Sequence, residues 1–113
     1  MPMGIRLFLK KLDILEKINF DIEEVGSPIK FNWGKCPLAT ASFGHGITTT
    51  LLQLTKAYSI IVNGGYDVNP SLIFSNEKKF EKKAILNKDL SKKILPILRK
   101  IVTEQEGTAS LAN

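Results

Sequence analysis

The sequence predicts an α+β fold that is mostly helical, with a short β-hairpin or extended segment near residues 66–86. Three segments space their apolar residues as amphipathic helices do. Between the second and the third, Tyr66–Phe74 has an extended pattern, and Lys78–Lys83 is polar, as in a surface hairpin or loop. The three helical segments are residues 5–18, 51–62 and 88–105.

The first segment is predicted as one amphipathic helix, whose apolar side chains fall on one face. Residues 19–37 lose this periodicity, and glycine and proline residues interrupt them. We therefore expect a long loop there, of a kind that wraps another element or carries function. The apolar residues of the first helix are Leu7, Phe8, Leu12, Leu15 and Ile18.

The middle segment has the strongest local signals. Gly44 and Gly46 flank His45, so the backbone can adopt positive φ on either side. Thr50 and Gln53 have the spacing of a capping box, which predicts a helix that starts there and continues to about Val62. Asn63-Gly64-Gly65 then ends the helix, because glycine readily takes the left-handed conformation of a helix C-terminus.

This middle helix is apolar on most of its sides, which is typical of a helix inside a core. One stripe holds Leu51, Leu54, Tyr58 and Ile61, and Leu52, Ala57, Ile60 and Val62 widen the coverage. A chain of 113 residues cannot easily cover so many apolar faces. We therefore expect the chain to be unstable on its own.

The last helix is predicted over residues 88–105, with Asn87 as its cap. Pro96 lies within this segment, where it lacks an N–H and crowds the carbonyl of Lys92. We expect either a kink at Pro96 or a helix that begins near it. The stripe expected to be buried consists of Leu90, Ile94, Ile97, Leu98 and Ile101.

Length and composition limit the class of protein. A chain of 113 residues with 43% hydrophobic and 24% charged residues is sized and composed as one globular domain or part of one. No apolar run approaches the roughly 18–20 residues that a bilayer-spanning helix needs. The chain does not begin with a basic segment followed by an apolar one, so we predict no targeting signal within these residues.

The chain is basic, with 16 Lys and Arg against 11 Asp and Glu and a formal charge of +5. Its lysines concentrate in Lys78–Lys93, where Glu81 and Asp89 interrupt them and aromatic residues do not alternate with them. We interpret this segment as a solvated basic face rather than a nucleic-acid site. The alternative function is a small basic binding module for an anionic partner, either nucleic acid or a membrane surface.

No catalytic, cofactor-binding or metal-ligating residue is predicted in this chain. The single Cys36 cannot form an internal disulfide, and we interpret it as a small, partly buried residue. His45 is the only histidine, and the spacing indicates no nucleophile for it to activate, so we predict a hydrogen-bonded turn histidine. Trp33 and Tyr58 are predicted as packing residues.

The order of residues in Ala39–Pro70 resembles a recurring signature of the transpeptidase domain of penicillin-binding proteins. His45 between two glycines is similar to the division-specific, monofunctional branch, and Leu51 stands where the family has proline. A weaker resemblance extends over residues 5–112. The matching residues are Ser42, Phe43, Gly44, Gly46, Thr50, Leu52, Gln53, Leu54, Ala57, Tyr58, Asn63, Gly64, Gly65 and Pro70.

The resemblance implies the penicillin-binding, β-lactamase-like fold and a peptidoglycan D,D-transpeptidase that cross-links stem peptides during septal cell-wall synthesis. It implies serine acyl transfer through three motifs, S-x-x-K, S-x-N and K-[ST]-G, with no cofactor. Peptidoglycan stem peptides, β-lactams and division proteins would be the partners of the whole protein, and nucleic acid would not. The whole protein would lie on the periplasmic side of the bacterial inner membrane, held by an anchor upstream.

None of these catalytic motifs is convincingly present in the chain. Ser27–Lys30 and Ser75–Lys78 match S-x-x-K in letters, and we interpret both as chance matches in a lysine-rich sequence. We therefore expect residues 1–113 to be a partial transpeptidase domain, from between the second and third motifs, and inactive alone. In the full domain Tyr66 and Asn69 are expected to line a substrate groove. A non-catalytic scaffold that binds other division proteins is a third hypothesis.

Overall fold

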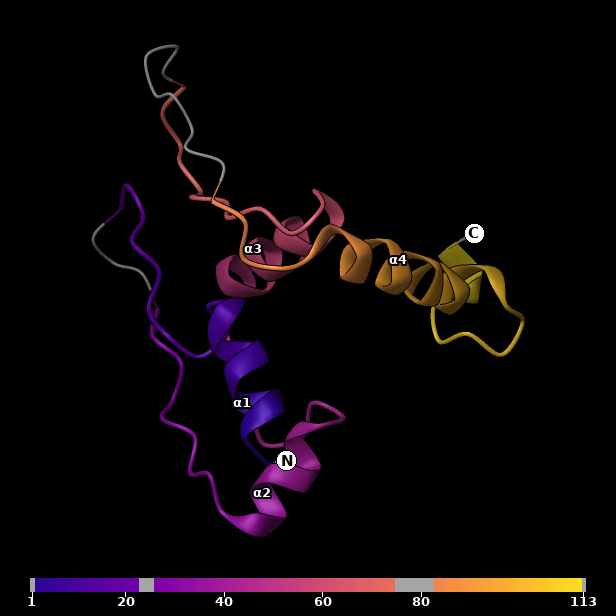
Figure 1. The fold of residues 1–113 in the computed structure, drawn as a ribbon, viewed down its shortest axis with the longest axis horizontal. Helices are drawn as coiled ribbons and strands as arrows, with labels where there is room; N and C mark the ends of the chain where they lie inside the picture. Colours follow the sequence, from indigo (N-terminus) through magenta and orange to yellow (C-terminus); the bar gives the residue numbers. More distant parts are fainter. Residues whose placement is uncertain (1, 23–25, 75–82, 113) are drawn as a thin grey trace.

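The computed structural model describes residues 2–22, 26–74 and 83–112 and is mostly helical. Figure 1 shows α3 at the centre of the fold, with α1 and α2 on one side of it and α4 extending from the other. One antiparallel bridge, from Tyr66 to Ala84, is the β-pairing found among the described residues. The helices are α1 (Pro2–Lys11), α2 (Lys35–Ala41), α3 (Leu51–Val62), α4 (Lys88–Thr103) and the 3₁₀ turn η1 (Ser110–Ala112).

The first helix is shorter than the predicted 5–18, because α1 ends at Lys11 and a turn follows. Asp13 has a φ of 55°, a left-handed conformation that an α-helix cannot continue through. The turn is held from outside: the hydroxyl of Thr49 donates to the carbonyl of Ile14 at 3.1 Å. Contacts with the α3 region, which the apolar periodicity does not encode, therefore decide where α1 ends.

Helix α2 is not predicted by the sequence, because its first residues fall in the segment expected to be a long loop. Gly34 precedes the helix as its N-cap, and Pro37 occupies its first turn. Proline is tolerated at that position because the first N–H groups of a helix have no partner within the helix. The rest of the predicted loop, up to Trp33, contains no helix or strand among its described residues.

The predicted start, end and caps of the middle helix are confirmed, whereas its predicted burial on most sides is not found among the described residues. Gly44 and Gly46 both have φ of 81°, and the capping box between Thr50 and Gln53 is formed in both directions. After α3, Gly64 and Gly65 have φ of 94° and 93°. The backbone of Gly65 then pairs with the chain that leads into α4, where the N–H of Ile85 donates to its carbonyl at 2.8 Å.

The predicted hairpin or extended segment near 66–86 takes the form of the antiparallel bridge between Tyr66 and Ala84. The N–H of Asp67 donates to the carbonyl of Lys83 at 2.8 Å, next to the pairing of Tyr66 with Ala84. The polar stretch Lys78–Lys83 falls, apart from Lys83, outside the described residues.

Asn87 caps α4 as predicted, since its side chain accepts from the N–H of Asp89 at 2.9 Å. The helix begins at Lys88 and runs through Pro96, so the alternative start near Pro96 is wrong. The buried stripe was also wrong in part: Leu90, Ile97 and Ile101 are 37%, 63% and 41% exposed. The reason is that α4 packs against α3 and η1 and leaves the remainder of its apolar face uncovered.

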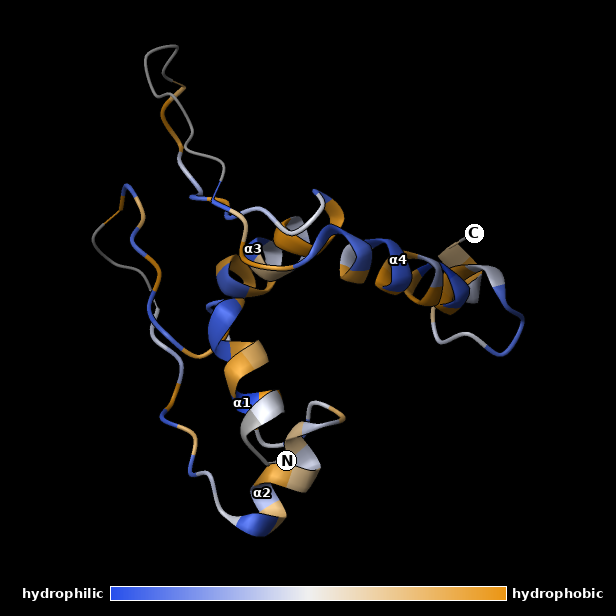
Figure 2. Cartoon of the chain, viewed as in Figure 1, coloured by the Kyte–Doolittle hydropathy of each residue, from blue (hydrophilic) through white to orange (hydrophobic). Residues whose placement is uncertain are grey.

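The hydrophobic core is small and lies where α1, α3 and the chain before α4 meet. Its buried members are Leu12, Ala57, Ile60 and Leu86, and Phe8 and Ile61 are among the residues packed against it. In Figure 2 the orange, apolar parts of the ribbon extend along α3 and α4 well beyond this meeting point. Much of the apolar surface of these helices is therefore outside the core.

Candidate functional site

The best-organised region of the chain is the start of α3. Its third residue, Gln53, is fully buried, and its side-chain oxygen accepts from the N–H of Thr50 at 2.8 Å. The hydroxyl of Thr50 accepts from the N–H of Gln53 at 3.3 Å, which completes the capping box. The side-chain nitrogen of Gln53 also donates to the carbonyl of Glu16, so the helix start is bonded to the turn after α1.

One turn further along α3, Lys56 joins three parts of the chain. Its ammonium donates to the carboxylate of Asp13 at 2.6 Å and lies 3.3 Å from that of Asp67, while the lysine side chain is 5% exposed. Burial by itself lowers the pKa of Lys56, but the hydrogen bonds and charges of the two carboxylates outweigh it and raise the pKa above its ordinary 10.5. Lys56 is therefore a buried, charged link between the turn after α1 and the chain after α3.

This ion-pair cluster is not among the features predicted from the sequence. A signal was present, because Lys56 is the single charged residue in an otherwise uncharged helix. A charge in such a helix is costly to bury unless it is paired. The sequence does not indicate which residues pair with Lys56. Asp13 lies 43 residues before it, and Asp67 lies beyond the glycine turn.

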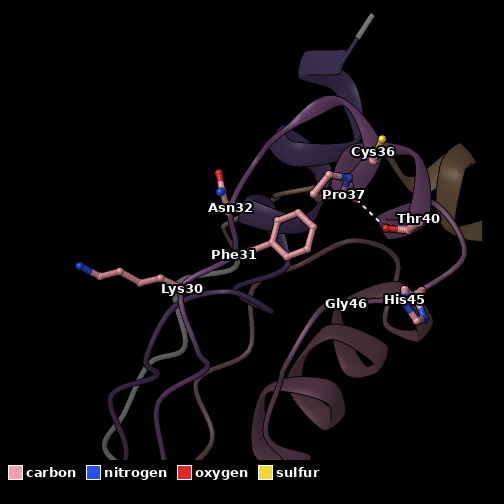
Figure 3. A pocket seen from close by; sticks show the side chains of 8 residues that line it. All are labelled: Lys30, Phe31, Asn32, Cys36, Pro37, Thr40, His45 and Gly46. Carbon is pink, nitrogen blue, oxygen red and sulfur yellow. Dashed lines mark hydrogen bonds between the residues drawn. The ribbon is translucent and has the colours of Figure 1, made fainter.

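A cavity of about 410 Å³ lies between the loop before α2, α2 itself and the turn that contains His45. Figure 3 shows the ring of Phe31 near its centre, while the side chain of Lys30 extends away from it. The hydroxyl of Thr40 donates to the carbonyl of Pro37 at 3.1 Å within this lining. The lining residues are Lys30, Phe31, Asn32, Cys36, Pro37, Thr40, His45 and Gly46.

His45 lies in a turn as predicted, and its backbone N–H donates to the carbonyl of Thr40 at 3.0 Å. Its exposed ring lies 6.3 Å from the ring of Phe43 between the ring centres. The prediction that Cys36 is partly buried is wrong: its thiol is free and the residue is exposed. Cys36 is the second residue of the short α2 and borders the open cavity, so no element covers it.

Trp33 packs against other side chains as predicted, whereas Tyr58 does not. The Trp33 ring meets Phe31 edge to face at 4.5 Å between centres, and the guanidinium of Arg6 lies 5.6 Å from its ring centre. Tyr58 is 46% exposed on the face of α3 that points away from the core, so it is not a packing residue within the part of the chain that the structure describes. Tyr66 and Asn69 are both exposed, and their place in a substrate groove stays a prediction.

The two letter matches to S-x-x-K do not lie on a helix that the structure describes. Ser27 and Lys30 are exposed in an irregular segment, whereas the working motif needs serine and lysine one helical turn apart. Ser75 and Lys78 fall outside the described residues. The hydroxyl of Ser27 therefore has no lysine held beside it by a helix, and a serine without such a neighbour is a weak nucleophile at neutral pH.

The described residues hold neither a cluster that could bind a metal ion nor a helix that could cross a membrane. In residues 2–22, 26–74 and 83–112, no three side chains of the His, Cys, Asp or Glu types gather where a metal ion could be held. Across those ranges, every helix is too short or too polar to cross a bilayer. The basic face begins outside the described residues, and Lys88, Lys92 and Lys93 continue it as exposed side chains on α4.

Comparison with known proteins shows that the chain is similar to parts of longer proteins. A stage V sporulation protein D from Bacillus subtilis (strain 168) is 26% identical over 114 residues, which cover 88% of this chain and 18% of that protein. The crystal structure of a peptidoglycan glycosyltransferase from Burkholderia ambifaria superposes with a TM-score of 0.85 at 16% identity, over 99% of this chain and 36% of that one. The chain thus has the fold of part of a much longer protein.

The sequence family described as penicillin binding protein transpeptidase domain matches residues 5–112, nearly the whole chain. This range includes the glycine turn, the capping box and the Gly64–Gly65 stop, which the structure forms as described above. The mostly helical fold with one short extended pairing agrees with a section of that domain. The chain belongs to the penicillin-binding protein transpeptidase domain family.

Proposed function

We propose that residues 1–113 are the section of a peptidoglycan D,D-transpeptidase domain that lies between its second and third catalytic motifs. The observation that carries the proposal is the family match over residues 5–112. The solved structure supports it, because this chain superposes on that longer one with a TM-score of 0.85 and covers 36% of it. Within the whole protein this section serves as scaffold, and its side chains take no covalent part in the reaction.

The reaction we propose for the whole protein is serine acyl transfer on the D-Ala-D-Ala end of a stem peptide. The serine oxygen attacks the carbonyl carbon of the penultimate D-Ala, its proton passes to the motif lysine, and the terminal D-Ala leaves with that proton. An amine of a second strand then attacks the resulting ester to form the cross-linking amide, and its proton passes through the motif lysine to the serine oxygen, which restores the serine. A β-lactam acylates the same serine, because its strained amide presents an equivalent carbonyl.

We place the whole protein in septal cell-wall synthesis, on the periplasmic side of the bacterial inner membrane. The support is the resemblance of Gly44-His45-Gly46 to the division-specific branch. Division proteins are the partners that this placement implies. An anchor outside residues 1–113 would hold the protein at the membrane.

The sequence of the flanking DNA tests the proposal. We expect the reading frame to contain S-x-x-K and then S-x-N upstream of Met1, and K-T-G shortly after Asn113. A locus whose reading frame holds none of the three motifs on either side would contradict it. An S-x-x-K and an S-x-N upstream without K-T-G downstream would contradict the assigned position of this section.

A further inference from the structure

The face of α3 that points away from the core is apolar and, within the part of the chain that the structure describes, exposed along the whole helix. Four side chains form it, and we refer to them as the outer stripe. They are 81%, 40%, 46% and 56% exposed, in the order Leu51, Leu54, Tyr58 and Val62. Their spacing of three or four residues places them on one face, one turn after another. The opposite face of the same helix holds Ala57 and Ile60 in the core.

The outer stripe has no charge, and the hydroxyl of Tyr58 is its one polar side-chain group. Lys56 is the single charged residue of α3, and its side chain is buried on the other face. The hydroxyl of Thr55 donates to the carbonyl of Leu51 at 2.8 Å, and that of Ser59 donates to the carbonyl of Thr55 at 2.8 Å. These two hydroxyls are therefore satisfied within the helix, so a partner of the stripe needs to supply apolar contact and one hydrogen bond to the Tyr58 hydroxyl.

These features select the chemistry of the partner. An anionic membrane surface or a nucleic acid binds through lysine and arginine, and the outer stripe presents neither. A continuous exposed apolar face on a helix marks a protein interface. The chain, moreover, spans 36% of the solved protein whose fold it shares and 18% of its curated relative, so the fold contains much more chain than these residues supply.

We infer that the outer stripe is an interface inside the transpeptidase domain, covered in the whole protein by an apolar element from outside residues 1–113. This inference rests on the proposed function and deepens it, because it names the surface through which this section joins the remainder of the domain. The covering element presents apolar side chains over Leu54 and the ring of Tyr58, with one polar group to bond the Tyr58 hydroxyl and no charged group placed against them. α3 is then buried on both faces, as a central helix of the domain.

Cysteine accessibility tests the inference on two proteins, the 113-residue chain and the longer protein encoded with its flanking sequence. Both carry Cys36→Ser and no other reactive cysteine, and each receives Tyr58→Cys. In the short chain the new thiol reacts with a maleimide at the rate of an exposed cysteine. In the longer protein we expect the rate to fall at least about tenfold, because the thiol then reacts only after local opening.

Lys100→Cys is the matched control, since the side chain of Lys100 is 65% exposed and pairs with Glu104 on the same helix. Its rate should agree between the two proteins within about twofold, because a surface position needs no opening to react. Val62→Cys probes the C-terminal end of the same face. It replaces Tyr58→Cys in the test if that variant does not fold.

Equal labelling of Tyr58→Cys in the two proteins would overturn the inference. Protection of the short chain that increases with its own concentration would assign the stripe to a second copy instead. Protection that requires vesicles of phosphatidylglycerol would assign it to a membrane. A longer protein that fluorescent penicillin labels, but whose Tyr58→Cys stays accessible, overturns this inference alone. A longer protein that protects Tyr58→Cys without penicillin labelling overturns the proposed function alone.

Discussion

Gln53 in the first turn of α3 is bonded to the carbonyl of Glu16, 37 residues earlier in the chain. The same side chain closes the capping box with Thr50, so one buried amide both starts the helix and attaches it to the turn after α1. The oxygen of the amide serves the cap, and its nitrogen serves the long-range bond. A residue that supplies only the oxygen would therefore keep one function and lose the other.

Gln53→Glu is predicted to destabilise the chain, although glutamate is as good as glutamine in an isolated capping box. The carboxylate keeps the bond to Thr50 but turns an acceptor toward the carbonyl of Glu16. We expect a loss of about 2–3 kcal/mol in the free energy of unfolding, as for a buried polar group without its partner. Urea unfolding followed by far-UV circular dichroism, in buffer containing sulfate to favour the folded state, measures it. A loss below about 0.5 kcal/mol would mean that the bond to Glu16 is of no consequence.

Gly65→Ala and Gly64→Ala form a matched pair, because both glycines have positive φ near 93°. A Cβ on Gly65 would overlap the carbonyl of Leu86, whereas one on Gly64 would lie 3.8 Å from its nearest neighbour, Tyr66. We expect Gly64→Ala to cost about 1 kcal/mol from backbone strain alone, and Gly65→Ala about 3 kcal/mol or more. The difference between their urea midpoints checks this, and equal midpoints would contradict the close approach of Leu86.

Ser91 is buried in the first turn of α4, and its hydroxyl donates to the carbonyl of Ile61. That carbonyl belongs to the last turn of α3, where the helix itself supplies no N–H. Ser91→Ala should cost about 1–2 kcal/mol by leaving the carbonyl unpaired. Ser59→Ala is the control, since the hydroxyl of Ser59 bonds to a carbonyl within its own helix. If both variants unfold at the same urea concentration, the bond between α3 and α4 does not stabilise the fold.

The ion pairs of Lys56 give a stability term whose pH dependence has a definite sign. Because the folded-state pKa is raised above 10.5, the stabilisation is complete below the ordinary pKa and is lost as pH rises through the raised one. Lys56→Met should lower the free energy of unfolding by about 2 kcal/mol at pH 7 to 9, and less at higher pH. Thermal unfolding of both proteins at pH 7, 9 and 11 measures the gap. A gap that widens toward pH 11 would contradict the assigned direction.

Local signals in the sequence predicted the parts of the fold that are held locally. The capping box at Thr50, the glycines after Val62 and the cap at Asn87 each act within a few residues, and each is found as predicted. The family resemblance predicted the fold of the whole section, and the comparisons confirm it.

The sequence could not indicate what contacts between distant residues decide. The α1 helix ends at Lys11 because the following turn is bonded to residues of the α3 region, and its apolar pattern continues past that point. Periodicity marked the apolar face of α4 but not whether another element covers it, and Ile97 is 63% exposed. In the site, Asp13 and Asp67 come close to Lys56 only when the chain has folded, so local sequence signals do not indicate them.

We propose that the reacting serine belongs to the transpeptidase domain but lies outside residues 1–113. Incubation with a fluorescent penicillin, followed by peptide mapping of the labelled protein, locates this serine. We expect no covalent label on the 113-residue chain, and one labelled serine, upstream of Met1, in the longer protein encoded with its flanking sequence. A label on Ser27 or Ser75 in either protein would show that this assignment of the serine is wrong.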